Sequence, residues 1–247
     1  MKISPEEEIM GSFSIKFERF WQVFYDHNGY VRVLEGLKNT ITIAIFGLII
    51  GVIIGTAIAA IEVSPKKSIF ARILNRLCIF YVGLFRGTPI VVQLLVTYYV
   101  ALPLLGINMT PVNVCVLVFG LNSGAYVSEI MRGGILSVDP GQMEAGRALG
   151  LSYGITMIKV VVPQAVKNIL PTIGNEFIAL IKETSVVSFV GALDLYVAFN
   201  YIGTNNYEFM VPYLVMALIY IVLVMFISFL IKTMERSLRR SDRSSKS

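Results

Sequence analysis

Charge, histidine and cysteine are all scarce in this sequence. Only 15% of its 247 residues are charged and 55% are hydrophobic, whereas a soluble domain carries about 25% charged residues. The single histidine, His27, and the isolated Cys78 and Cys115 give neither a metal-ligand spacing nor a disulfide framework. With a mean hydropathy of +0.72, the chain has more apolar surface than water can cover, and we expect an all-α membrane protein.

The motifs of nucleotide binding and of membrane enzymes are missing as well. No G-x-x-x-x-G-K-[S/T] phosphate loop occurs, so the chain itself is not expected to use ATP, and energy for any work it does must come from another subunit or from an ion gradient. We therefore expect no catalytic residue, no metal and no cofactor on this chain. The net charge is +5, but most of the positive residues lie in connections and in the tail, so no nucleic-acid partner is expected.

Long uncharged runs predict five transmembrane helices, since a helix needs about 20 apolar residues to cross a bilayer. One uncharged run extends over 42 residues, and Pro103, Gly106 and Pro111 divide it into two spans joined by a tight turn. The predicted spans lie at 40–61, twice within 87–128, within 165–193 and at 209–231.

Lysine and arginine alternate between the predicted connections. Successive connections and the C-terminal tail carry four, zero, three, zero and six of them. Because cytoplasmic loops are enriched in these residues, we expect the N-terminus outside and the C-terminus in the cytoplasm. The N-terminal arm, with Lys16, Arg19 and Arg32 among its positive residues, is an exception to this rule.

Aromatic residues on one helical face of the arm predict an amphipathic helix on the outer membrane surface. They are Phe13, Phe17, Phe20, Trp21 and Phe24. The predicted organisation is an interfacial arm over 1–38, a transmembrane domain over 39–232 with a cytoplasmic loop at about 132–163, and a basic cytoplasmic tail over 233–247.

The cytoplasmic loop carries the signals of short, capped helices. Asp139 suits an N-cap, Pro140 the first helical position and Gly150 a left-handed C-cap. Ser152 is placed to cap a second helix, which Pro163 is expected to interrupt. Such a segment is either a rigid lever for docking on a partner or a plain connector.

The same loop resembles the signature of ABC-importer permeases, in which E-A-A, three residues, G, nine residues and I-x-L-P follow one another. The residues at those places here are Glu144, Ala145, Gly146, Gly150, Val160, Val162 and Pro163. Stretches 85–89, 125–135 and 180–185 are similar to one branch of that family, the polar amino acid permeases of the histidine, glutamine and arginine type. The resemblance extends from about residue 35 to residue 240.

This resemblance implies a type I ABC-importer permease that crosses a bacterial inner membrane several times. The loop would form a coupling helix that enters a groove on an ATP-binding cassette ATPase, and that partner would bind ATP and Mg. A second permease, identical or a paralogue, and an extracellular or periplasmic substrate-binding protein would complete the importer. The coupling residues carried over from the family are Glu144, Ala145, Gly146 and Gly150.

Polar side chains form stripes on helical faces within the predicted spans. Such residues at membrane depth are expensive and indicate a lined pathway. The candidates for the substrate pathway are Gln93, Thr97, Asn122, Ser123, Tyr126, Glu129, Asn175, Glu176, Lys182, Glu183, Ser185 and Ser188. Glu176 is the preferred contact for a cationic group.

Several of these candidates have a structural alternative. Gln93, Asn122 and Ser123 also suit interhelical hydrogen bonding. Lys182 and Glu183 also suit pairing with partners across the helix bundle, which would bear on gating. Basic amino acids fit the acidic groups, but neutral ones such as glutamine are equally compatible. A gradient-driven transporter is the competing interpretation; it predicts inverted repeats, which the sequence does not display, and leaves the capped loop without a role.

Overall fold

The computed structural model describes residues 5–65 and 68–244, and over this part the chain is helical, which confirms the all-α prediction. Lys66, Lys67 and the outermost residues of the arm and tail lie outside the described part. The α-helices are α1 (Pro5–Trp21), α2 (Gly29–Val63), α3 (Ile69–Gly87), α4 (Ile90–Val96), α5 (Leu102–Leu104), α6 (Pro111–Leu136), α7 (Pro140–Ala148), α8 (Tyr153–Thr156), α9 (Val162–Glu183), α10 (Leu195–Asn206) and α11 (Met210–Ser244). Turns of other pitch are η1 (Gln22–Asp26), η2 (Thr97–Ala101) and η3 (Met157–Val161), which are π-helical, and η4 (Thr184–Val190), which is a 3₁₀-helix.

The described residues contain three to five candidate membrane spans. Helices α2, α6 and the first 28 residues of α11 are each long and apolar enough to cross a bilayer. Two helix pairs meet that requirement only together: α3 with residues 90–104, bent by 105°, and residues 153–190 with α10, bent by 56°. The five predicted spans correspond to counting each bent pair once.

The second span begins earlier than the sequence predicts. Helix α3 starts at Ile69, so Arg72 and Arg76 lie on the exposed side of a helix rather than in a connection. The helix ends at Gly87 because the next residue, Thr88, precedes a proline and adopts extended backbone, with φ −123° and ψ 144°. The prediction that the second span lies wholly within residues 87–128 is therefore wrong.

The connection expected between the last two spans is also largely helical. It contains α10, whose Leu195, Phe199 and Ile202 are completely buried. These side chains pack in one cluster with Val33 of α2 and Val211 of α11. The segment is therefore part of the packed bundle, although it lies outside the spans that the sequence predicts.

Helices α2 and α6 pack through glycines that face the partner helix. A Cβ atom on Gly51 would lie 2.6 Å from Ser123 Oγ, and one on Gly55 would lie 2.7 Å from the backbone nitrogen of Ser128. From the other side, a Cβ on Gly120 would lie 2.6 Å from a methyl group of Ile50. Small residues let two membrane helices approach closely, so this stripe fixes the centre of the bundle.

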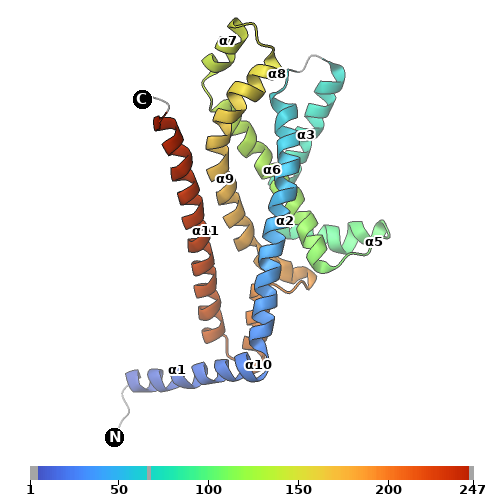
Figure 1. The fold of residues 1–247 in the computed structure, drawn as a ribbon. Helices are drawn as coiled ribbons and strands as arrows, with labels where there is room; N and C mark the ends of the chain where they lie inside the picture. The colour runs from blue at the N-terminus through green and yellow to red at the C-terminus, as the bar shows by residue number, and fades with distance from the viewer. Residues whose placement is uncertain (1–4, 66–67, 245–247) are drawn as a thin grey trace.

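The two chain ends lie at opposite ends of the bundle. Figure 1 shows α1 across the end where α2 and α11 begin, and α7 together with the C-terminal end of α11 at the other. Within the arm, Phe20 is buried while Phe13, Phe17 and Trp21 remain exposed. That α1 lies on the outer membrane surface stays a prediction.

Two of the positive residues of the arm that break the charge rule, Lys16 and Arg32, contact other parts of the chain. Lys16 Nζ lies 3.8 Å from Glu208 Oε1, in the turn between α10 and α11. The guanidinium carbon of Arg32 lies 3.8 Å from the ring centroid of Tyr201, which is a cation–π contact. These contacts give a physical reason for positive residues at this end of the bundle.

Candidate translocation pathway and coupling segment

Helix α7 is capped as the sequence predicts. The Asp139 carboxylate accepts a hydrogen bond of 2.8 Å from the Gly141 backbone N–H, with Pro140 at the first helical position. Gly150 follows the helix with φ +82°, in the left-handed region. The Leu151 N–H then donates to the Gly146 carbonyl over 3.1 Å, which closes the helix end. Helix α7 is therefore a helix with both ends capped, and it lies at one end of the bundle (Figure 1).

The coupling residues do not all face the same way. Glu144, Ala145 and Gly150 are exposed, whereas Gly146 is buried against Thr156 of α8. A side chain at position 146 would overlap Thr156, so Gly146 joins α7 to α8 instead of lying on the surface. Leu149 was not among the predicted coupling residues, yet it is 83% exposed directly after α7. An apolar residue beside the capping glycine of a polar loop is the signal that was available.

Pro163 does not interrupt the chain as predicted. Residues 153–190 form one run of helix, with the π-helical turn η3 directly before α9. In η3 the Val162 N–H donates to the Met157 carbonyl, five residues back. Pro163 then stands in the first turn of α9, where a missing N–H is tolerated. The predicted coupling loop therefore continues directly into a helix, α9, that carries candidates for the substrate pathway.

Gln93 and Asn122 brace the break between α3 and α4. Gln93 Nε2 donates to the carbonyls of Phe85 (2.8 Å) and Thr88 (3.0 Å), which the break leaves without helical donors. Asn122 Nδ2 in turn donates to Gln93 Oε1 over 3.0 Å. Irregular backbone at membrane depth needs such partners, so these two candidates have a structural part in the bend.

Ser123 and Glu176 meet at the centre of the bundle. The completely buried Ser123 hydroxyl donates to Glu176 Oε1 over 3.0 Å, which connects α6 to α9. On its other side Ser123 packs on Gly51 of α2. The carboxylate of Glu176 is therefore held at a junction of three helices.

Other candidates lie on the open side of the same helices. Tyr126, Asn175, Lys182 and Glu183 are exposed. The Tyr126 ring lies 5.3 Å from the guanidinium carbon of Arg86. These groups provide both donors and acceptors next to the Glu176 junction, which is the chemistry that a zwitterionic substrate needs.

The remaining candidates are separated from this junction or bond locally. Thr97 is half-buried in η2. Glu129 Oε2 pairs with Arg132 Nη2 at 2.6 Å. The hydroxyls of Ser185 and Ser188 donate back to the carbonyls of Lys182 and Ser185 within their own helical segment.

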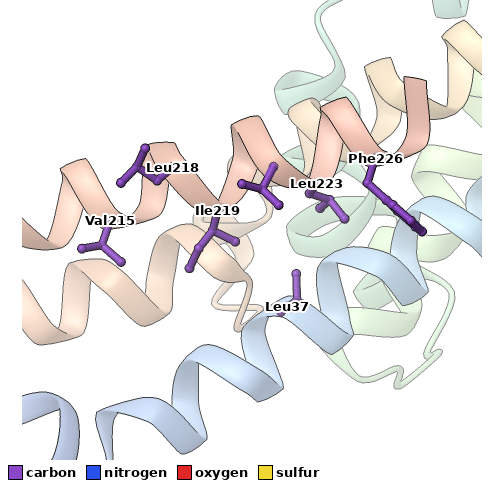
Figure 2. A pocket seen from close by; sticks show the side chains of 7 residues that line it. Leu37, Val215, Leu218, Ile219, Leu223 and Phe226 are labelled. Atoms are coloured by element: carbon purple, nitrogen blue, oxygen red, sulfur yellow. The ribbon is translucent and has the colours of Figure 1, made fainter. Parts of the chain in front are cut away.

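A groove between α2 and α11 has a different character. Its volume is about 380 Å³, and Figure 2 shows the aliphatic and aromatic side chains that line it. The lining residues are Leu37, Val215, Leu218, Ile219, Val222, Leu223 and Phe226. With no polar side chain to pair with a charged ligand, this groove does not suit an amino acid.

Comparisons with known proteins agree with the resemblance that the sequence displays. Residues 47–240 match the family model described as "binding-protein-dependent transport system inner membrane component". The chain is 40% identical over 210 residues to the arginine transport system permease protein ArtQ of Bacillus subtilis, covering 85% of this chain and 94% of that protein. It is 34% identical over 209 residues to the glutamine transport system permease protein GlnP of Escherichia coli K12, covering 84% and 93%.

Two solved structures have the same fold. One is described as the crystal structure of an amino acid ABC transporter with histidines; it matches with a TM-score of 0.77 and 38% identity over 84% of this chain and 94% of its own. An inward-facing structure of the MetNI methionine ABC transporter matches with a TM-score of 0.72 over 84% of this chain and 96% of its own. Its identity of 20% supports the fold alone.

Proposed function

The chain belongs to the family of binding-protein-dependent transport system inner membrane components, and we propose that it forms the membrane pathway for a basic amino acid. As a member it is a permease subunit of an ABC importer, a multi-pass protein of the inner membrane without a catalytic domain of its own. The observation that carries the proposal is the hydrogen bond from the buried Ser123 to the partly buried Glu176, which fixes a carboxylate at the junction of three helices.

Glu176 supplies a negative group where the substrate side chain would pass. A carboxylate held by a hydroxyl is a good acceptor for a guanidinium or ammonium group. Lys182 and Tyr126, on the exposed side of the bundle, supply donors for the carboxylate of the amino acid. The arginine transport named for the relative from Bacillus subtilis favours the same substrate class, whereas the glutamine transport named for the relative from Escherichia coli represents the neutral alternative.

We place the N-terminus outside, the C-terminus in the cytoplasm and five crossings between them. The alternation of Lys and Arg along the chain supports this orientation. The position of α7 at the same end as the C-terminal end of α11 supports it too (Figure 1). In this orientation α7 faces the compartment where ATP is available.

Helix α7 is the proposed contact with an ATP-binding cassette ATPase, and that partner would hold ATP and Mg. Glu144, Ala145 and Leu149 are the exposed residues that would enter its groove. Gly146 and Gly150 act from within the segment, because one allows α7 to pack on α8 and the other ends the helix. Closure of two ATPases around ATP would pull on this helix and change the access of the pathway.

The open polar side of the bundle calls for a second permease. Tyr126, Asn175, Lys182 and Glu183 are exposed at membrane depth, where polar groups face a protein interior or a water-filled cavity rather than lipid. A second copy or a paralogue would close the pathway over them. A substrate-binding protein would deliver the amino acid at the end of the bundle where α1 lies.

The test is ATP-driven uptake into proteoliposomes that contain the permease, its ATPase and its binding protein, with arginine, lysine, histidine and glutamine as substrates. We expect uptake of the basic amino acids, and a loss of more than about tenfold in Glu176→Gln because a charged hydrogen bond is removed. Glu183→Gln, an exposed carboxylate in the same helix, is the matched control with a smaller effect.

Each outcome bears on a different part of the proposal. Uptake of glutamine alone would refute the basic substrate and leave the importer intact. Equal uptake by wild type and Glu176→Gln would refute the role of Glu176. No uptake of any amino acid upon ATP addition would refute the pathway itself.

A further inference from the structure

We propose that Tyr153, together with the ion cluster of Arg132, Glu129 and Glu62, positions the coupling segment on the last turn of α2. The coupling segment is residues 137–163, and the inference rests on the proposed function of α7. Its consequence is that force on α7 reaches the pathway through α2 as well as through α9.

The first link is a hydrogen bond between residues that are 90 positions apart. The Tyr153 hydroxyl donates to the Val63 carbonyl over 2.9 Å. Tyr153 opens α8 and Val63 closes α2. The last carbonyls of a helix have no intrahelical donor, so the tyrosine satisfies an acceptor that the helix itself leaves open.

Packing alone does not fix the Tyr153 side chain. It lies between two cavities of about 420 Å³ and 540 Å³ and forms part of the wall of each. Val63, Ile135 and Met157 also line both cavities. The hydroxyl therefore adds a fixed point on α2 to a side chain that borders open space.

The second link is the ion cluster of Arg132, which precedes α7 in the chain, whereas Tyr153 follows it. Arg132 Nη2 lies 2.6 Å from Glu129 Oε2, and Arg132 Nε lies 3.6 Å from Glu62 Oε2. The Glu62 side chain is only 9% exposed, against 40% for Arg132, so the pair is partly shielded from water. Arg132 is on the last turns of α6, which leads directly into the coupling segment.

The two links converge on adjacent residues. The segment before α7 is tied to Glu62 and the segment after α7 is tied to Val63, the last two residues of α2. Between them, Gly146 joins α7 to α8 as one unit. Further along, α2 packs on Ser123 through Gly51, and Ser123 bonds Glu176. A continuous set of contacts therefore runs from α7 through α2 to the proposed substrate contact.

Tyr153→Phe tests the first link because it removes one hydroxyl and keeps the ring. In proteoliposomes with the ATPase and the binding protein, we expect the amino acid transported per ATP hydrolysed to fall about fivefold, the size of one hydrogen bond. ATP hydrolysis without substrate stays as in wild type. Glu62→Gln is expected to act in the same direction. Tyr25→Phe, an exposed tyrosine at the opposite end of the bundle, is the matched control and leaves the ratio unchanged.

Hydrogen exchange of the same complexes gives a readout that does not require transport. Amides of α8 and η3 should exchange faster in Tyr153→Phe than in wild type or Tyr25→Phe, because the segment is released from α2. An unchanged ratio of transport to hydrolysis, or equal exchange in all three proteins, overturns the inference. So does a joint fall of both activities with a lower melting temperature, since that is a general loss of structure.

The proposed function fails in a different way. If the wild-type complex shows no ATP-driven uptake, the importer proposal is refuted. Hydrogen exchange then remains as the test of whether Tyr153 positions the coupling segment on α2. Faster exchange in Tyr153→Phe then supports the link, and equal exchange overturns it.

Discussion

Gly51 and Ser123 are in direct contact across the α2–α6 interface, so that a Cβ atom at position 51 would lie 2.6 Å from Ser123 Oγ. The same hydroxyl donates to Glu176. The absence of a side chain on one helix thus sets the position of a carboxylate on a third. This arrangement makes the centre of the bundle sensitive to changes that do not touch a charged residue.

Substitution of Gly51 by valine should therefore destabilise the bundle. The added atoms overlap Ser123, and overpacking of this kind costs about 1–3 kcal/mol. Gly83→Val is the matched control, since no atom lies within 4 Å of a Cβ at Gly83 in α3. Thermal unfolding of the solubilised proteins measures the difference. If both variants melt at the same temperature, close packing of α2 on α6 is not what stabilises the fold.

Gln93→Leu should destabilise the bend between α3 and α4. The change removes the Gln93 donor from the Thr88 carbonyl and leaves the Phe85 carbonyl only the longer bond of 3.4 Å from Asn122 Nδ2. An unsatisfied buried acceptor costs about 1–3 kcal/mol. Thr97→Val, in the next turn of the same span, is the comparison variant. We expect a lower melting temperature for Gln93→Leu alone, with an unchanged KM for uptake by the protein that remains folded. A raised KM without a change in melting would instead make Gln93 a substrate contact.

Local signals in the sequence predicted local structure well. Asp139 and Gly150 each act on the backbone within a few residues, and both caps form as expected. Helix α3 was missed because Arg72 and Arg76 break an otherwise apolar run, although an amphipathic helix accommodates them on its exposed side. Charge content alone does not distinguish such a helix from a loop.

The spacing of polar residues along the sequence did not predict which residues they would contact. Helical spacing indicates which residues share a face, but it does not tell what that face meets. Gln93 and Asn122 were expected in the pathway with a structural alternative, and the structure gives them bonds that hold the bend. Gly146 was expected at the ATPase, yet it meets Thr156 of its own chain. Both outcomes depend on tertiary contacts between residues that are distant in sequence or separated by a turn.

Leu149→Ala should weaken the binding of the ATPase and leave the permease folded. Leu149 is 83% exposed in the chain alone, so its removal leaves no cavity, whereas burial of a leucine in a partner's groove contributes about 1.5–3 kcal/mol. Ile158→Ala, which removes another exposed apolar side chain at the same end, is the control. Titration of the ATPase against the solubilised permease should show at least about tenfold weaker binding for Leu149→Ala only. Equal binding by both variants contradicts the docking of α7 through Leu149.

Lys16→Met and Glu208→Ala should destabilise the protein by different amounts, although they break the same ion pair. The pair is 3.8 Å long and partly exposed on the Lys16 side, so its loss alone should cost less than about 1 kcal/mol. Glu208 does more, because its carboxylate also accepts from the backbone N–H groups of Met210 (3.0 Å) and Val211 (3.3 Å) at the start of α11. Loss of such a cap adds about 0.5–2 kcal/mol.

Thermal unfolding at low and high salt separates these two contributions. Salt screens the ion pair, so the effect of Lys16→Met should shrink in 1 M NaCl as the wild type loses the same interaction (~3 Å screening length). The larger effect of Glu208→Ala should persist, because the cap consists of short hydrogen bonds to the backbone. Equal melting temperatures for the two variants in low salt would mean that the Glu208 cap does not stabilise α11.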